Sequence, residues 1–321
     1  MACRSRLTLC GARRRSGTSR LGLGLAALGR PGYINLGHDD DLGPRKDPAT
    51  LESEAHAVLD AAYDGGIRYF DAARSYGKAE EFVASWLEYR RLTPDDVTVG
   101  SKWGYTYTAD WRVDAEVHEV KDLSLTNLRR QLAESRGLLG PFLRVYQIHS
   151  ATLESGVLED RALLEELARM RETGLKIGLT VTGPRQRETI EKALEVGGFD
   201  TVQATWNLLE RSATPALEAA HSAGLGVIVK EAVANGRLTG RGDVPTLREL
   251  AERLGVTPDV LALASVLSQP WADVVLSGAA TVSQLRSNLA ALELDLDPGL
   301  EAQLAEDPDR YWTKRAALSW N

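Results

Sequence analysis

The stretch Gly-Ile-Arg-Tyr-Phe-Asp-Ala-Ala-Arg-Ser-Tyr-Gly at residues 66–77 joins a short apolar run to a polar loop that ends in glycine. An apolar run of this length, bounded by glycine and polar residues, is typical of a buried β-strand. Asp71 stands where the predicted strand ends, and Tyr76 follows in the loop. The stretch therefore places a carboxylate and a phenol near the carboxyl end of one strand.

Two further polar side chains follow apolar runs in the same way. Lys102 comes after Val-Thr-Val-Gly-Ser (97–101), and His149 comes after Val-Tyr-Gln-Ile (145–148). The carboxyl ends of successive parallel strands meet on one rim of a barrel, where barrel enzymes carry their catalytic groups. We therefore expect one proton-handling site made of Asp71, Tyr76, Lys102 and His149.

Short apolar runs alternate with longer amphipathic stretches along the rest of the chain. Glycines that mark helix ends, such as Gly174 and Gly224, help to separate the two kinds of segment. Strands are predicted at 21–27, 67–70, 97–100, 143–148, 176–180, 201–204, 226–229 and 273–276. Helices are predicted at 52–64, 79–90, 123–136, 161–172, 185–196, 215–223, 246–267 and 282–292.

This alternation favours an α/β fold with parallel strands, a single (β/α)8 TIM barrel. The chain has 321 residues, and such a barrel typically takes about 250. The competing open doubly wound sheet needs a glycine-rich phosphate turn after its first strand, and Gly22 and Gly24 do not continue into that spacing. We assign residues 21–321 to one barrel domain, with a solvated loop at 39–47 and a C-terminal tail over one face.

Composition narrows the possible partners. A net charge of −7 and the absence of a basic stripe argue against nucleic-acid binding. No apolar run approaches the roughly 20 residues that cross a bilayer, so we expect no membrane partner.

The two cysteines, Cys3 and Cys10, lie in the first ten residues, which excludes a disulfide framework or cysteine zinc site in the body. Scattered histidines argue against a metal-dependent hydrolase, and we expect no metal site: His38, His56, His118, His149 and His221.

The N-terminus differs from the body. Residues 1–20 hold six arginines, and the first acidic residue is Asp39. We interpret 1–20 as a disordered extension, either a misassigned start in a GC-rich bacterial gene or an organelle transit peptide. The first interpretation predicts a cytoplasmic protein and the second an organellar one; the first is favoured.

At this point the chain resembles the aldo-keto reductases. Residues 66–80 are similar to the family pattern G-x-R-x-x-D-x-A-x-x-Y-G-x-x-E, and Lys102 and His149 stand where the family carries the rest of its catalytic tetrad. The resemblance covers roughly residues 20–295. It implies an NAD(P)(H)-dependent oxidoreductase that reduces an aldehyde or ketone to an alcohol, or catalyses the reverse reaction, on a small substrate.

The tetrad also makes physical sense. A tyrosine has an ordinary pKa of about 10, and a neighbouring ammonium would lower it while a carboxylate keeps the ammonium charged. We expect Tyr76 to be the general acid of reduction, Lys102 to lower the pKa of Tyr76, and Asp71 to hold Lys102. His149 would orient the substrate oxygen, and the hydride must come from a cofactor.

The resemblance also implies cofactor contacts. Gln203 would bind the nicotinamide carboxamide, Trp206 would stack on the ring, and Thr180 would offer its hydroxyl in a segment that lacks the family's usual Asn. Gly24, at the end of the first strand, is a further candidate contact.

Later segments would hold the phosphates. After the seventh strand Lys230, Glu231 and Arg237 replace a segment whose amides cradle the pyrophosphate. The last strand leads into a helix whose N-terminus favours a phosphate, with the candidates Ser277, Gly278, Ala279, Gln284 and Asn288. Many relatives carry Arg at the position of Ala280 to pair with the 2′-phosphate, and Arg286 could take its place. The family favours NADP(H), while NAD(H) stays open.

Aromatic residues crowd the predicted mouth of the barrel. Tyr33, Trp103 and Tyr105 are the candidates for a substrate pocket, since flat rings beside hydroxyls suit sugars and small carbonyl compounds. One alternative function is an aldose 1-dehydrogenase working in the oxidative direction. Another is a cofactor-binding regulatory subunit with little turnover. The sequence leaves the substrate, the direction and the oligomeric state open.

Overall fold

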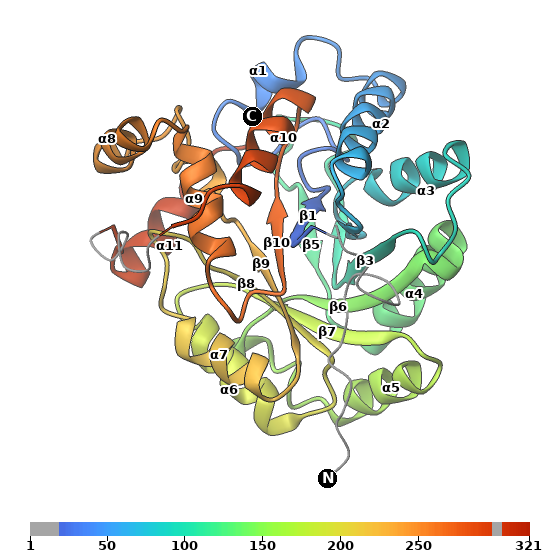
Figure 1. Ribbon diagram of the computed structural model, residues 1–321. Helices are drawn as coiled ribbons and strands as arrows, with labels where there is room; N and C mark the ends of the chain where they lie inside the picture. Colours follow the sequence, from blue (N-terminus) through green and yellow to red (C-terminus); the bar gives the residue numbers. More distant parts are fainter. Residues whose placement is uncertain (1–18, 297–303) are drawn as a thin grey trace.

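The computed structural model describes residues 19–296 and 304–321. Within them, eight parallel strands close into a barrel in the order β1-β10-β9-β8-β7-β6-β3-β2, ringed by helices (Figure 1). The predicted (β/α)8 barrel is confirmed. The barrel strands are β1 (Leu21–Gly24), β2 (Tyr69–Asp71), β3 (Thr98–Trp103), β6 (Leu143–Ala151), β7 (Lys176–Val181), β8 (Thr201–Thr205), β9 (Gly226–Lys230) and β10 (Val274–Ser277).

Helices follow the strands, and short 3-10 turns extend some of them. The α-helices are α1 (His38–Leu42), α2 (Pro48–Asp64), α3 (Ala79–Tyr89), α4 (Leu125–Leu139), α5 (Arg161–Glu172), α6 (Gln186–Val196), α7 (Thr214–Ser222), α8 (Pro245–Leu254), α9 (Pro258–Leu267), α10 (Val282–Leu289) and α11 (Pro308–Ala316). The 3-10 turns are η1 (Gly140–Phe142), η2 (Leu153–Ser155), η3 (Ala234–Gly236) and η4 (Ala290–Leu292).

Several predicted segments differ from the structure; the strand predicted at 21–27, for example, ends at Gly24. The single helix predicted at 246–267 is two helices, because Gly255 adopts a left-handed conformation with φ of 69° and Pro258 opens α9. The loop predicted at 39–47 begins with a short helix, α1, which three consecutive aspartates favour in its first turn.

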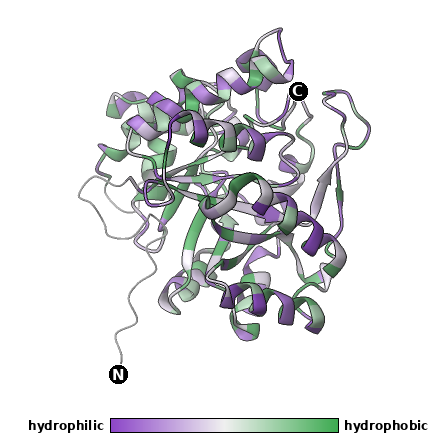
Figure 2. Ribbon diagram, turned by 90° about the vertical axis from the view of Figure 1, so that its right-hand side faces the viewer, coloured by the Kyte–Doolittle hydropathy of each residue, from purple (hydrophilic) through white to green (hydrophobic). Residues whose placement is uncertain are grey.

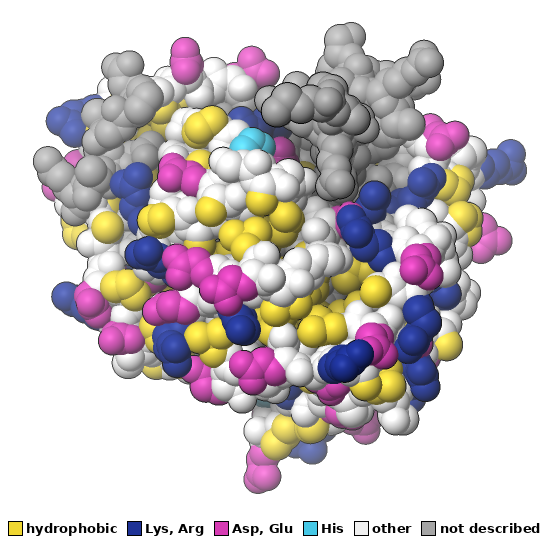
Figure 3. Space-filling model, turned by 90° about the horizontal axis from the view of Figure 1, so that it is seen from below, with side chains coloured by type: hydrophobic (Ala, Val, Ile, Leu, Met, Phe, Trp, Pro, Cys, Tyr) yellow, Lys and Arg dark blue, Asp and Glu magenta, His cyan; other side chains and the backbone are white. Residues whose placement is uncertain are grey.

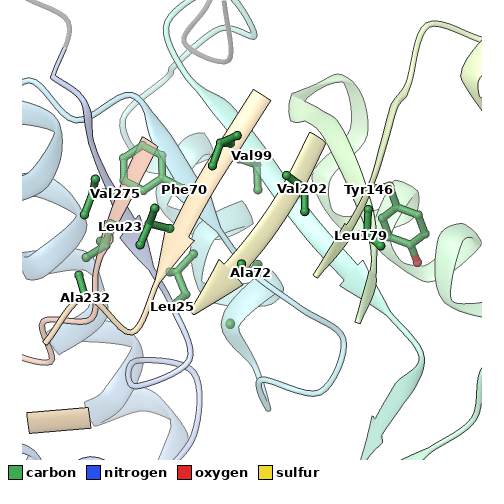
Figure 4. Close-up of a cluster of buried hydrophobic side chains, with 14 of the residues drawn as sticks. Leu23, Leu25, Phe70, Ala72, Val99, Tyr146, Leu179, Val202, Ala232 and Val275 are labelled. Carbon is green, nitrogen blue, oxygen red and sulfur yellow. The ribbon is translucent and has the colours of Figure 1, made fainter. Parts of the chain in front are cut away.

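Side chains alternate across the barrel wall. In β2, Phe70 points out toward α3 and lies 5.1 Å from the Trp86 ring, centroid to centroid. Its neighbour Tyr69 points inward, where its hydroxyl lies 3.3 Å from an oxygen of Asp71. Figure 4 shows Leu23 and Val275 of the adjoining strands grouped with Phe70. The main core therefore lies between barrel and helices, and Figure 2 shows the apolar strands at the centre with polar residues on the outer helices.

A two-stranded antiparallel hairpin, absent from the sequence prediction, leaves the barrel after β3. It pairs β4 (Tyr105–Tyr107) with β5 (Glu119–Lys121). Gly104, with φ of 114°, turns the chain between β3 and β4. The hairpin brings Glu119 to the catalytic rim of the barrel.

The C-terminal tail is fastened to the same rim. The Tyr311 hydroxyl accepts a hydrogen bond of 3.0 Å from Asn207 Nδ2, and Arg237 pairs with Glu306 at 2.8 Å. Past α11, the last residue exchanges both backbone hydrogen bonds with Tyr33, each 3.1 Å long. The tail therefore closes over the loop that follows β1.

Most of the arginine-rich extension predicted at 1–20 lies outside the described residues. Its final two residues contact the barrel: the Ser19 N–H donates to Gly66 O at 3.3 Å, and Arg20 donates to Leu267 O at 2.6 Å. These contacts place the start of the described chain against the barrel body.

The surface mixes charges of both signs. Figure 3 shows lysines and arginines interspersed with acidic side chains on the face seen from below, so the described residues of that face form no continuous basic stripe. In the described ranges, no helix has the length and apolar character to span a bilayer.

Candidate active site

A cavity of about 320 Å³ opens at the carboxyl ends of the strands. Asp71, Tyr76 and His149 line it, and Lys102 lies directly behind Asp71. The structure thus brings the four predicted catalytic residues together from β2, the loop after it, β3 and β6.

Backbone contacts position the Tyr76 loop. The loop runs along β3, since the N–H groups of Ala72 and Arg74 donate to carbonyls of that strand at 2.8 and 3.1 Å. Gly77, with φ of 58°, then turns the chain, and a Cβ there would lie only 2.3 Å from Gly29 O. The glycine therefore allows the loop to pack directly against the segment that follows β1.

Asp71 and Lys102 form a buried ion pair, with side chains 2% and 1% exposed. Lys102 also donates to Ala72 O at 2.9 Å. The second oxygen of Asp71 accepts from Gln203 Nε2 at 3.1 Å and lies 3.4 Å from Gln147 Nε2. These contacts satisfy both charges, as burial of an ion pair requires.

Tyr76 behaves differently from the sequence-based expectation that its pKa would be lowered. The Lys102 ammonium lies 4.7 Å from the centroid of the Tyr76 ring, but its charge is neutralised by Asp71. Burial, together with the Asp71 charge, raises the pKa of the Tyr76 phenol well above its usual value. The phenol therefore stays protonated across the neutral range, which suits a proton donor.

A bulge in β6 presents His149 to the cavity. Pairing with β7 shifts between Ile148 and Ala151, and Ser150 in the bulge has a positive φ of 53°. The Nδ1 of His149 lies 3.5 Å from the Ser75 hydroxyl. Burial, followed by the charges of Lys102, Lys230, Arg30 and Lys121, lowers the pKa of His149 well below its usual value. The imidazole is therefore neutral.

Arg30 is a buried cation beside Tyr76 that was not among the predicted site residues. The guanidinium carbon lies 4.6 Å from the Trp320 ring centroid and 5.3 Å from that of Tyr76. Its Nη1 pairs with Glu119 of the hairpin at 3.1 Å. The predicted pocket residue Tyr33 lines the cavity here, 4.9 Å from Arg30.

Thr180 and Gln203 line the cavity side by side, as their backbones pair in the sheet. The Thr180 Oγ1 accepts from Ser150 N–H at 2.7 Å and keeps its own hydrogen to donate. The Gln203 Nε2 is engaged by Asp71, which leaves the amide oxygen of Gln203 as an acceptor. One donor beside one acceptor matches the two halves of a carboxamide. Gly24 also borders this cavity.

The end of β9 contributes a charged chain. Lys230 Nζ donates to Thr205 Oγ1 at 2.8 Å, and Thr205 donates to Glu231 at 3.1 Å. Arg315 of α11 binds Glu231 through Nε at 3.0 and 2.9 Å. Burial raises the pKa of Glu231, but the charges of Arg315 and Lys230 outweigh it and lower that pKa to about 2. No local pattern marks Arg315 as a site residue, because its partner lies 84 residues away.

The predicted site residues Trp206, Arg237 and Trp103 do not line the cavity. Trp206 is fully buried, donates to Thr214 Oγ1 at 2.8 Å and packs 5.4 Å from the Trp271 ring, so it offers the cavity no stacking face. Arg237 points to Glu306 instead of a phosphate site. Trp103 is fully buried in the main core.

Tyr105 does not line the cavity itself but contacts a residue that does. Its ring contacts His149 edge to face with centroids 5.1 Å apart. It therefore supports the imidazole from the hairpin side.

The predicted phosphate segment before α10 is largely occupied by its own contacts. The Ala279 N–H donates to Ser277 Oγ at 3.3 Å, and the Ala280 N–H donates to Gln284 Oε1 at 2.8 Å. Asn288 contacts Ser277 Oγ at 2.8 Å. Ser277 and Gly278 border the cavity, and nothing lies within 4 Å of a Cβ built at Gly278. Arg286 is exposed on α10.

The cavity therefore fits a nicotinamide group at Thr180 and Gln203, with open space at Gly278 for a chain leading outward. Metal ions have no comparable place: within the described ranges, no group of three or more His, Cys, Asp or Glu side chains is arranged to hold one.

Comparisons with known proteins agree with this geometry. The sequence matches the aldo/keto reductase family over residues 20–304. The NADH-specific methylglyoxal reductase of Escherichia coli K12 is 28% identical, covering 91% of this chain and 96% of that protein. The D-threo-aldose 1-dehydrogenase of a Pseudomonas species is 26% identical, covering 89% and 94%.

Solved structures support the fold. The glycerol dehydrogenase of Gluconobacter oxydans superimposes with a TM-score of 0.66 at 21% identity, covering 95% of this chain and 94% of that one. The holo form of an aldo-keto reductase from Bacillus halodurans gives a TM-score of 0.65 at 20% identity, covering 95% and 96%. The fold, the tetrad and the family match over most of the sequence lead to one conclusion: the chain belongs to the aldo/keto reductase family.

Proposed function

We propose that this chain is an NAD(P)(H)-dependent oxidoreductase that reduces an aldehyde or ketone to an alcohol, with Tyr76 as the proton donor. The observation that carries the proposal is the meeting of Tyr76 and His149 in one cavity, with the Asp71–Lys102 pair behind them. Family membership supports carbonyl and alcohol chemistry. The same groups would catalyse alcohol oxidation in reverse.

The bound nicotinamide would supply the hydride, since no side chain can. Tyr76 would give its proton to the carbonyl oxygen as negative charge develops there. Its raised pKa keeps that proton in place until the oxygen becomes basic. The positive charge of Arg30, which lowers the pKa of Tyr76 against the effect of burial, would then favour the phenolate that is left, while Asp71 and Ala72 O hold Lys102 beside the ring.

His149 would position the substrate oxygen. With Nδ1 directed at Ser75, Nε2 is the nitrogen left for the cavity. The neutral imidazole can donate one hydrogen bond to the carbonyl without protonating it. Tyr76 and His149 would therefore act on the same oxygen in different roles.

Gln203 and Thr180 would hold the carboxamide, and Gly24, Ser277 and Gly278 would border the cofactor, since all five residues line the cavity. NADP(H) remains the favoured form, with the exposed Arg286 as the candidate for the 2′-phosphate. The cytoplasmic location predicted from the sequence stays a prediction.

The second candidate function is an aldose 1-dehydrogenase. It is favoured by the relative of that name and by the Arg30–Glu119 pair beside the Trp320 and Tyr33 rings, which could bind hydroxyl groups and the flat face of a sugar.

The test is steady-state turnover with NADPH and NADH against a panel of aldehydes, ketones and aldoses, starting with methylglyoxal. Wild type should oxidise the reduced cofactor, and Tyr76→Phe should not. Tight cofactor binding without turnover of the panel would favour the regulatory-subunit alternative.

A further inference from the structure

Lys230 is the cation of the cavity wall without a carboxylate of its own. Its Nζ lies 3.9 Å from Glu231 Oε1, but Arg315 already binds that carboxylate at hydrogen-bonding distance. Among the described residues, the hydrogen-bond partner of Lys230 is the neutral hydroxyl of Thr205 at 2.8 Å. The other cations that line the cavity, and Lys102 behind it, are each paired with a carboxylate: Lys102 with Asp71, Arg30 with Glu119 and Arg315 with Glu231.

Lys230 therefore leaves one positive charge without a carboxylate partner, and it lies on the side of the cavity where the nicotinamide is proposed to bind. Lys230 pairs with Thr205 in the sheet, and Gln203 lies two residues before Thr205 on the same face of β8. Lys230, Gln203 and Thr180 line one cavity of about 320 Å³. A ring whose carboxamide meets Gln203 and Thr180 therefore lies close to the Lys230 ammonium.

The two forms of the cofactor differ in charge at this ring. The oxidised nicotinamide ring is a cation, whereas the dihydronicotinamide ring is neutral. A neighbouring ammonium repels the first through its Coulomb field and is attracted to the electron-rich face of the second. We propose that Lys230 makes this cavity bind the reduced cofactor more tightly than the oxidised one, and so directs the enzyme toward carbonyl reduction.

This inference rests on the proposed function and adds the direction of the reaction. Its support is independent of the tetrad's role, because the surplus of one cation follows from the pairing of the charges alone. The low pKa of His149, to which Lys230 contributes after burial and Lys102, reports the same positive potential at the cavity.

The charge on Lys230 can be removed without mutation. Burial lowers its pKa to about 8, opposed by Glu231 beside it and by Asp71 of β2, and assisted by Arg315 of α11 and Lys102 of β3. The effect of Lys230 should therefore disappear as pH rises through this range. The oxidised cofactor should then bind more tightly, while the reduced one changes little.

The experiment is isothermal titration of the full chain with NADPH and NADP⁺ separately, repeated with NADH and NAD⁺. At pH 7 we expect wild type to bind NADPH at least about tenfold more tightly than NADP⁺. Lys230→Met should bring the two dissociation constants together by roughly tenfold, mainly by tightening NADP⁺. Lys121→Met, which removes an exposed cation near Tyr105, is the matched control and should keep the wild-type ratio.

The outcomes separate the two proposals. If both cofactor forms bind and Lys230→Met keeps the wild-type ratio, the inference is overturned and the proposed function stands. If neither form binds to wild type, both fall. Should Lys230→Met fail to fold, the same ratio measured on wild type from pH 6.5 to pH 9.5 decides, since the account requires it to fall as Lys230 loses its proton.

Discussion

Replacing Arg315 by Met should destabilise the protein by about 3 kcal/mol at pH 7. Glu231 is 8% exposed, and Arg315 is its principal counter-charge. The net effect of the surroundings is to lower the Glu231 pKa from 4.5 to about 2. At 1.36 kcal/mol per pKa unit, that shift corresponds to about 3 kcal/mol of stability. Removing one partner of a buried pair typically costs a similar amount, about 3–5 kcal/mol.

The stabilisation by the Glu231–Arg315 pair should depend on pH, because Glu231 must be ionised to attract Arg315. Glu231 has a lowered pKa in the folded state, so its contribution is fully present above pH 4.5 and is lost as pH falls toward 2. The difference in stability between wild type and Arg315→Met should therefore shrink by about half between pH 7 and pH 3. Below pH 2 it should reflect only the lost packing of Arg315 on Trp312.

The assay is urea unfolding of both proteins at several pH values, followed by circular dichroism. Arg310→Met, an exposed arginine on the same helix α11, is the control and should change stability by less than about 0.5 kcal/mol. A loss of that small size in Arg315→Met, or one that does not vary with pH, would show that Glu231 does not depend on Arg315.

Three further predictions concern the site. Tyr76→Phe should lower kcat by about 10²–10⁴-fold, the usual worth of a general acid, and leave the cofactor Kd within about twofold; a normal kcat would remove Tyr76 from the mechanism. Arg286→Ala should weaken the binding of NADPH more than that of NADH in titrations if Arg286 contacts the 2′-phosphate. Equal effects on both would show that Arg286 does not contact this phosphate. Trp206→Phe should leave cofactor affinity unchanged, because the indole packs on Trp271; a large loss would restore the stacking role.

The sequence was sufficient for the barrel and for the meeting of Asp71, Tyr76, Lys102 and His149 at one rim, because both follow from local patterns. Apolar runs mark strands, and a polar residue at the end of a parallel strand must face the common rim. The period of two within a strand could also have corrected Trp206. Gln203 lines the cavity and Thr205 accepts a hydrogen bond from Lys230 there, so the next residue, Trp206, turns toward the helices and the core.

Other features depend on contacts that no local pattern contains. Arg237 was predicted to be a phosphate ligand from its position in the loop after β9. In the folded protein it pairs with Glu306, which lies 69 residues away in the segment before α11. The hairpin strands β4 and β5 have three residues each, too short for a periodic signal. The Asp71–Lys102 pair was predicted, but the burial that raises the pKa of Tyr76 comes from the packing of the whole rim.

The most direct test of the account is transfer of deuterium from the nicotinamide carbon of labelled NADPH to methylglyoxal in a single turnover. Wild type should deliver the label to the carbonyl carbon of the alcohol product, and Tyr76→Phe should do so at least about 100-fold more slowly with the cofactor still bound. Transfer at the same rate in both proteins would contradict the role of Tyr76. Cofactor binding with no transfer by wild type to methylglyoxal or to any other carbonyl compound of the panel would contradict the proposed reduction itself.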